Sequence, residues 1–127
     1  MEYFTLYELG TNNINHFHDG FIDKLEHLRK TVGKPFYVTS CARSAERNKL
    51  VGGATKSLHI YDEVAYPERG QTGCMAVDIK IQSPQFKVEL IEKALSLGWS
   101  VGINDKKRFV HLDRRVDLKL PKAIFSY

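Results

Sequence analysis

The sequence has no apolar run that approaches the roughly 18 to 20 residues of a membrane-spanning helix. Residues 1–9 also lack the basic and then apolar segments of a secretory signal peptide. We therefore expect no membrane partner and no secretion by that route. The product is expected to stay in the cytosol of the cell that makes it, unless something else releases it.

A strong charge of one sign is absent as well. The net charge is +4, and no basic stripe with interleaved aromatic residues occurs in the chain. Domains that bind nucleic acids usually carry such a stripe, so no nucleic-acid partner is expected. The mild positive charge still favours approach to anionic surfaces.

Only two cysteines are present, Cys41 and Cys74. In a chain without a secretion signal, so few cysteines argue against a disulfide scaffold. Two small, partly buried thiols are the main expectation. A bond between them, or a metal-ligand role for Cys74, stays open as an alternative.

The composition is that of an ordinary folded domain. With 127 residues, of which 43% are apolar and 27% charged, the chain suits one domain with one core. Apolar residues at helical spacing predict a helix from residue 19 or 20 to about 30, with Asp19 as its N-cap and Gly33 after its end. Ser83 and Pro84 predict the start of a second helix over residues 85–97.

Shorter elements complete the pattern. A short helix is predicted over residues 45–50, and strands over residues 36–40, 76–81, 99–103 and 108–113. The last two strands are expected to pair around residues 104–107. The tail, residues 118–127, is expected to pack across the domain.

Three residues are candidate metal ligands: His59, Asp78 and His111. Two histidines and one carboxylate suit zinc and leave a coordination position open. Asp78 alternates with Val77 and Ile79, so the predicted strand places its carboxylate on the face opposite these apolar residues. His111 alternates in the same way with its apolar neighbours. Strands are the rigid supports that a metal site needs.

These residues lie in motifs that resemble a known family. The chain reads S-C-A-R-S-x-x-x-N-x-x-V-G-G-x-x-x-S-x-H up to His59, A-x-D-I around Asp78 and F-V-H-x-D around His111. This combination resembles the M15 family of zinc D-Ala-D-Ala carboxypeptidases and related endolysins, and is most similar to its short, phage-associated branch. The resemblance covers roughly residues 3–113. It implies a small α+β domain with a central antiparallel sheet flanked by helices, as in hedgehog signalling domains.

The resemblance also implies roles for these residues. His59, Asp78 and His111 would bind one zinc ion per chain. Arg43 would lie in the active site, where a guanidinium can grip a peptide carboxylate or steady charge on the attacked carbonyl. Ser57 would form a hydrogen bond within the site or orient its loop; a plain turn serine is the alternative.

The general base is left open by the sequence. Several members of the family carry an acid three residues before the last histidine, where this chain has Arg108, which cannot serve. Asp113 and Asp105 are the remaining candidates. Either of them is alternatively a partner that orients a ligand imidazole, or a surface charge.

Two further stretches need a role. Residues 60–73 form an insert, relative to the family, between two candidate ligands, and we interpret it as a loop or small hairpin that walls the substrate cleft or decorates the surface. His16 and His18 form an H-x-H pair with no further ligand nearby, so a structural or solvent-exposed pair is expected.

The sequence therefore favours a zinc-dependent peptidase acting on peptidoglycan stem peptides, either a D-Ala-D-Ala carboxypeptidase or an L-Ala-D-Glu endopeptidase. A phage-type lysis enzyme or virion component, working as a monomer on the wall after release, is expected. A non-catalytic zinc module that binds cell wall is the main alternative, and a metal-dependent nuclease is a weaker one.

Overall fold

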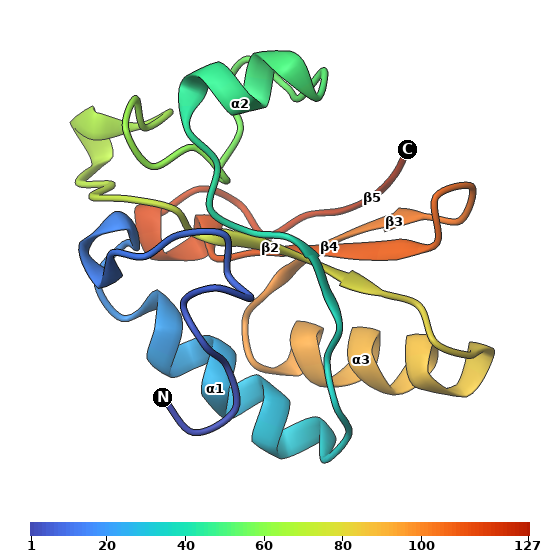
Figure 1. The fold of residues 1–127 in the computed structure, drawn as a ribbon. Helices are drawn as coiled ribbons and strands as arrows, with labels where there is room; N and C mark the ends of the chain where they lie inside the picture. Colours follow the sequence, from blue (N-terminus) through green and yellow to red (C-terminus); the bar gives the residue numbers. More distant parts are fainter.

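The protein, described over residues 1–127 by a computed structural model, is built around one five-stranded sheet (Figure 1). The strand order is β1-β2-β4-β3-β5. The strands are β1 (Val38–Ser40), β2 (Ala76–Lys80), β3 (Ser100–Asn104), β4 (Phe109–Asp113) and β5 (Ile124–Ser126). The predicted pairing of β3 with β4 is confirmed.

The sheet is antiparallel except for one pair, because β5 runs parallel to β3. After β4 the chain turns through the 3-10 helix η3 (Arg115–Leu118) and returns to the sheet at Ile124, opposite Val101. It thus enters β5 at the end of the sheet where β3 begins. The α+β class predicted from the sequence is confirmed, and the sheet is a mixed one whose parallel strand comes from the tail.

Two helices cover one face of the sheet: α1 (Phe21–Val32) and α3 (Pro84–Ser96) (Figure 1). α3 begins as predicted, because Ser83 Oγ accepts a hydrogen bond from the backbone N–H of Phe86 at 3.1 Å. The predicted N-cap of α1 is wrong: the helix starts after Gly20, which has φ 82° and no side-chain cap. No helix combines the length and apolar character needed to cross a bilayer.

The core lies between these helices and the sheet. Its side chains have no solvent exposure and come from both helices and from alternate positions of three strands: Phe21, Leu25, Leu28, Leu90, Ala94, Val77, Ile79, Val101, Val110 and Leu112. Burying each large apolar side chain stabilises the fold by about 1.5 to 3 kcal/mol before entropy is counted. This packing holds the strands rigidly, so side chains on the opposite face of the sheet have fixed positions.

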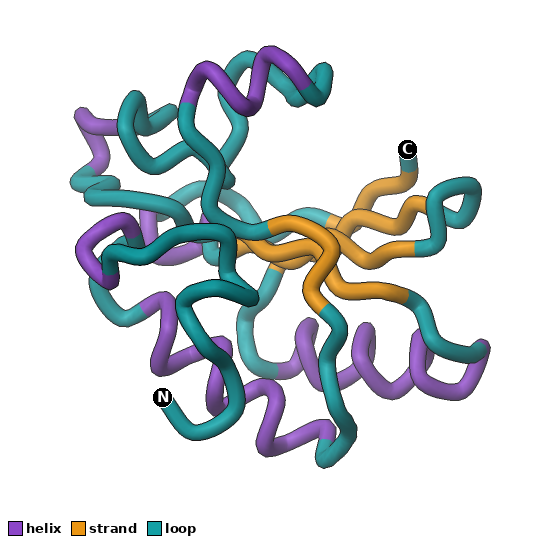
Figure 2. Tube along the Cα trace, viewed as in Figure 1, coloured by secondary structure: helices purple, strands orange, loops and turns teal.

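The other face is covered mainly by loops, as Figure 2 shows. The short helix α2 (Ala45–Leu50) lies over it, with Ser44 Oγ capping the N–H of Arg47 at 3.0 Å. The insert, residues 60–73, is a loop that contains one turn of 3-10 helix, η2 (Pro67–Arg69), and no hairpin.

The insert is fixed to the N-terminal loop, which contains the 3-10 helix η1 (Ile14–His16). Cys74 N–H donates to the His16 carbonyl at 2.8 Å, and the His16 ring stacks on Tyr61 with 3.8 Å between centroids. The His18 ring accepts a hydrogen bond from the backbone N–H of Thr72. Both histidines of the H-x-H pair therefore hold the insert in place.

Candidate metal centre

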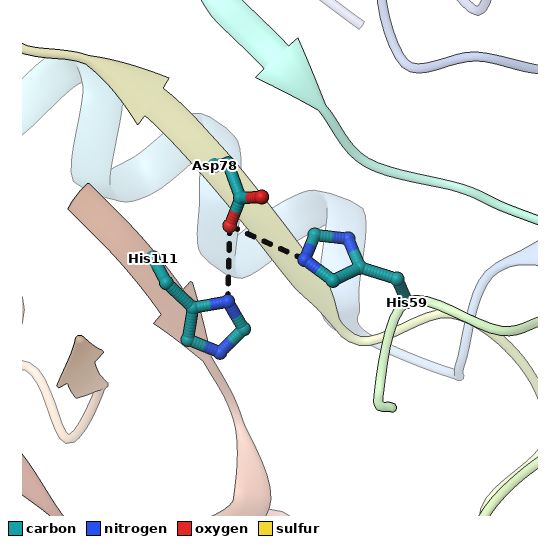
Figure 3. A group of neighbouring side chains, drawn as sticks. All are labelled: His59, Asp78 and His111. Atoms are coloured by element: carbon teal, nitrogen blue, oxygen red, sulfur yellow. Dashed lines mark hydrogen bonds and ion pairs between the residues drawn. The ribbon is translucent and has the colours of Figure 1, made fainter. Parts of the chain in front are cut away.

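His59, Asp78 and His111 converge on one point above the sheet (Figure 3). His59 Nε2 lies 3.2 Å and His111 Nδ1 lies 3.0 Å from the same oxygen, Asp78 Oδ1. One donor atom from each residue lies within 4.8 Å of the other two, and all three residues are buried. The structure thus brings together the three ligands that the sequence predicts.

Strand register explains how two of them meet. Asp78 on β2 is directly opposite His111 on β4, and side chains of directly opposed residues point to the same face. His59 arrives from the loop after α2. That loop is bound to its neighbours by backbone hydrogen bonds, from Arg43 N–H to His59 O at 3.0 Å and from Met75 N–H to Leu58 O at 2.9 Å.

Each imidazole has its outer nitrogen already engaged. His59 Nδ1 lies 2.7 Å from the carbonyl oxygen of Cys41, which can only accept, so this nitrogen carries a proton. His111 Nε2 donates to Asp113 Oδ2 at 2.8 Å. The nitrogens that face Asp78 are therefore the ones left to bind a metal. Histidine ligands in metalloproteins are oriented in this way, by a carbonyl or a carboxylate behind the ring.

The contact between His59 and Asp78 calls for a cation. Burial lowers the pKa of His59 despite the nearby Asp78 carboxylate, so the ring is neutral and has one proton. That proton satisfies Cys41 at 2.7 Å, which leaves a nitrogen lone pair facing a carboxylate oxygen at 3.2 Å. Two acceptors at this distance repel unless a positive ion lies between them. The donor set thus fits a divalent metal, and its two nitrogens and one oxygen suit zinc.

The rest of the centre is strongly polarised. Burial raises the pKa of Asp78, but its contact with the protonated His111 outweighs burial and holds it below the usual range. Burial lowers the pKa of His111, yet Asp113 and Asp78 together raise it to about 9. In the metal-free protein, His111 is therefore an imidazolium held between two carboxylates.

Arg43 holds the second oxygen of Asp78. Its Nη2 donates to Asp78 Oδ2 at 3.4 Å, its Nη1 to Asn48 Oδ1 at 3.2 Å and its Nε to Ser40 Oγ at 2.8 Å. Asn48 is buried and is itself held by a hydrogen bond to Ala54 O. Each terminal nitrogen of the guanidinium keeps one further N–H. The predicted placement of Arg43 beside the ligands is observed.

Ser57 is buried behind His59. Its Oγ accepts a hydrogen bond from the backbone N–H of His59 at 3.2 Å, and the residue lines the cleft. This contact agrees with the expectation that Ser57 orients the loop of a ligand.

The two acids proposed as general base occupy other positions. Asp113 has no solvent exposure, and its oxygens accept from His111, from the Arg115 backbone and from the Arg115 guanidinium at 2.9 and 2.7 Å. Its pKa is lowered to about 2, because His111 and Arg115 outweigh burial. This geometry favours the alternative given for Asp113, a partner that orients the His111 ring; its role as general base stays a prediction.

Asp105 does not join the group. It lies on the exposed β3–β4 turn and forms an ion pair with Lys87 of α3 at 2.6 Å. It is not among the residues that line the cleft. The structure therefore gives Asp105 no contact with the candidate ligands.

An open cleft of about 1130 Å³ surrounds the three ligands. One wall comes from α2 and the loop after it, and the other from β4, β5 and the β3–β4 turn. Phe125 of β5 lies over His111 with 5.7 Å between ring centroids. A Cβ at Gly102, opposite His111 in β3, would lie 2.4 Å from the Phe125 ring, so only glycine leaves room for it.

The sequence analysis did not identify two residues of the cleft, Arg115 and Phe125. Arg115 lies two residues after Asp113, and a cation so close to a buried carboxylate was the available signal. Phe125 had no signal beyond an apolar tail. Of the insert, Tyr66 alone lines the cleft.

The two cysteines are free and buried, as expected. Both thiols donate to the Ala76 carbonyl at 3.3 Å. Neither belongs to the metal-ligand group, which contains His59, Asp78 and His111 only. Cys74 thus fills space beside the site and is not an extra ligand.

Comparison with known proteins agrees with this geometry. A family model described as Peptidase M15 matches residues 7–113, a stretch that contains all three candidate ligands together with Arg43 and Ser57. A search of curated proteins found no match. The family match supports a hydrolase of the metallopeptidase kind, and the His-Asp-His group could hold the metal of such an enzyme. The chain belongs to the Peptidase M15 family.

Proposed function

We propose that the protein is a zinc-dependent peptidase that hydrolyses the stem peptides of peptidoglycan. The family match supports the reaction class. The observation that carries the metal is the facing pair of acceptors, His59 Nε2 and Asp78 Oδ1, at 3.2 Å. When bound, zinc supplies a Lewis acid and lowers the pKa of a water molecule.

The surrounding side chains prepare the site. Cys41 O fixes the His59 ring, and Asp113, itself gripped by Arg115, fixes the His111 ring. Both imidazoles are thereby held with their inner nitrogens bare toward the cleft once His111 loses its extra proton. Strands β2 and β4 keep this arrangement rigid, which is what catalytic geometry requires.

Arg43 is the substrate-facing group of the proposal. It lines the cleft and is oriented by three hydrogen bonds. Its two remaining N–H groups suit a substrate carboxylate or the oxygen of the attacked carbonyl. Because the guanidinium is already held in position, it loses little conformational freedom when a substrate binds.

Turnover of defined wall peptides tests the proposal. Zinc-loaded protein is incubated with purified peptidoglycan and the products are identified by mass spectrometry. Loss of D-alanine identifies a D-Ala-D-Ala carboxypeptidase, and cleavage between L-alanine and D-glutamate identifies an endopeptidase. Activity should disappear with a chelator and return with zinc. Full activity in chelator would remove the proposal.

A second candidate is a non-catalytic zinc module that binds the wall. The occupied state of Asp113 and the remote position of Asp105 favour it, because they leave no free acid beside the ligands. Glu8, the one other carboxylate in the cleft lining, accepts from Thr5 through Oε1 and does not belong to the metal-ligand group. Zinc-dependent wall binding without product at any pH would support this module. Released D-alanine or a cleaved stem peptide would end it.

The biological setting is also proposed. The resemblance to the phage-associated branch supports a lysis enzyme or virion component that reaches the wall after release from the cytosol. One zinc ion per chain and a monomeric working unit complete the proposal. Sedimentation of the zinc-loaded protein measures the mass of the working unit, and elemental analysis of the same sample counts the zinc per chain.

A further inference from the structure

The cleft lining contains more lysine and arginine side chains than carboxylates. Five cationic side chains line it, against three carboxylates: Arg43, Arg47, Lys56, Lys107 and Arg115, against Glu8, Asp78 and Asp113. Arg43 is bound to Asp78, and Arg115 is bound to Asp113. Arg47, Lys56 and Lys107 form no ion pair in the structure, although six other lysine and arginine side chains do.

These three cations flank the cleft from both walls. Arg47 lies on α2, and Lys56 lies on the loop that follows. Lys107 lies on the opposite wall, in the β3–β4 turn, whose shape is fixed by a hydrogen bond from Lys107 N–H to Asn104 Oδ1 at 2.9 Å. An elongated ligand in the cleft would therefore meet positive charge on both walls.

The insert contributes to this arrangement. Lys56 Nζ lies 5.1 Å from the centroid of the Tyr66 ring, a distance at which cation and ring attract each other. Tyr66 is the insert residue that lines the cleft. This contact links the exposed Lys56 ammonium to the insert at the edge of the cleft.

The charge of these cations is only partly offset from within the cleft. Asp78 and Asp113 are already bonded to arginine and histidine, which leaves Glu8 as the one lining carboxylate without a cationic partner, against three such cations. A concave site lined by uncompensated charge focuses the electric field and attracts a ligand of opposite sign. A zinc ion would add to the positive charge.

We propose that the cleft binds carboxylates of the peptide, other than the group at the cleaved bond, at an anion subsite lined by Arg47 and Lys56 on one wall and by Lys107 on the other. The inference rests on the proposed function, because the ligand is taken to be a wall peptide. The subsite selects peptides whose glutamate or diamino-acid carboxylates are free over the same peptides with these groups amidated. Arginine offers a bidentate fork, and the lysines offer mobile point charges.

Matched peptides test the subsite through binding. Two synthetic stem peptides differ only in having the carboxylates free or amidated, and their affinities for the zinc-loaded protein are measured by calorimetry at low and high salt. The free acid should bind about tenfold more tightly at low salt. The preference should shrink as salt rises, because exposed charges are screened.

Variants assign the effect to residues. Arg47→Gln, Lys56→Gln and Lys107→Gln should each reduce the preference, and the triple variant should abolish it. Lys49→Gln and Lys106→Gln are matched controls, because they lie on the same helix and the same turn yet do not line the cleft. All five side chains are exposed, so the variants should fold.

The outcomes separate the subsite from the peptidase proposal. Binding that favours the free acid, without cleavage of either peptide, supports the subsite and refutes the peptidase. Cleavage with equal affinity for both peptides refutes the subsite alone. A preference that survives in the triple variant also refutes it. Equal competition by a glycerol phosphate polymer would reassign the cations to a wall phosphate and overturn the carboxylate proposal.

Discussion

The two faces of the central sheet are made by the same strands and are both buried, yet they depend on different forces. On the helix-covered face, Val77 and Leu112 need only be removed from water. On the cleft face, Asp78, His111 and Asp113 are 4%, 8% and 0% exposed, and each needs a specific partner because a buried polar group without one is costly. Alternation along a strand sets where a side chain lies; its hydrogen bonds set its protonation and its chemistry.

Removal of a candidate metal ligand should have the largest effect on the function of the cleft face. His111→Ala leaves two candidate ligands, so we expect loss of stoichiometric zinc and a fall in peptidase activity of about a thousandfold or more. Zinc content by mass spectrometry and release of peptide products measure both effects. His27→Ala is the control, because His27 is an exposed histidine on α1. Retention of one zinc per chain in His111→Ala would contradict the ligand assignment.

A cavity in the helix-covered face should act on stability alone. Leu90→Ala removes a fully buried side chain and should lower the free energy of unfolding by about 2 to 5 kcal/mol. Urea unfolding measures this loss. Zinc affinity of the folded protein should stay as in the wild type, because Leu90 lies on the far side of the sheet. A matching loss of zinc affinity would show that the two faces are coupled.

Removal of the support behind His111 should have an intermediate effect. Arg115→Met releases Asp113 from its bidentate partner, so the His111 ring is held less firmly. We expect zinc affinity to fall by about 10-fold to 100-fold, measured by competition with a chelator. Arg108→Met, at an exposed position in the β3–β4 turn, should leave the affinity unchanged. Equal affinity in both variants would show that Arg115 does not position the ligand.

The smallest effect concerns pH in the metal-free protein. Asp113 and Asp78 raise the pKa of His111 to about 9, above the ordinary value of about 6.5 in an unfolded chain. The protonated form thus adds stability in full below pH of about 6.5, and this contribution is lost as pH rises through about 9. The Tm of the metal-free protein should fall over that window.

Bound zinc should remove the pH dependence of Tm that comes from His111. The zinc affinity itself should change with pH in the opposite direction. Because the metal displaces the extra proton of His111, zinc affinity should rise about tenfold per pH unit below pH of about 9. Calorimetry in buffers of different ionisation enthalpy counts the released proton. A pH-independent affinity together with a flat Tm profile would contradict an imidazolium between two carboxylates.

Local sequence signals predicted the elements that depend on local chemistry. Ser83 and Pro84 mark the start of α3, and alternation around Asp78 and His111 places both on one face, because a strand has a side-chain period of two. The family motifs added His59, whose loop has no periodicity. The structure brings these three residues together as predicted.

Features that depend on distant contacts were not predictable in the same way. Asp105 pairs with Lys87, eighteen residues earlier, and the direction of a turn side chain is not encoded in its neighbours. The state of Asp113 is a local feature that was missed, because η3 folds Arg115, two residues later, back onto it. Strand β5 is three residues long and pairs in parallel with a strand more than twenty residues away. It therefore has no hairpin pattern from which it could be predicted.

Gly102 offers a way to adjust the width of the active cleft. The Phe125 ring occupies the place where a side chain at this position would stand, and the same ring forms part of the wall beside His111. Any larger residue at 102 would push the ring and its strand outward, while the candidate ligands, which belong to β2, β4 and the loop after α2, would keep their supports. Substrate size and metal chemistry are therefore separable in this architecture, and protein engineering could alter the first while leaving the second intact.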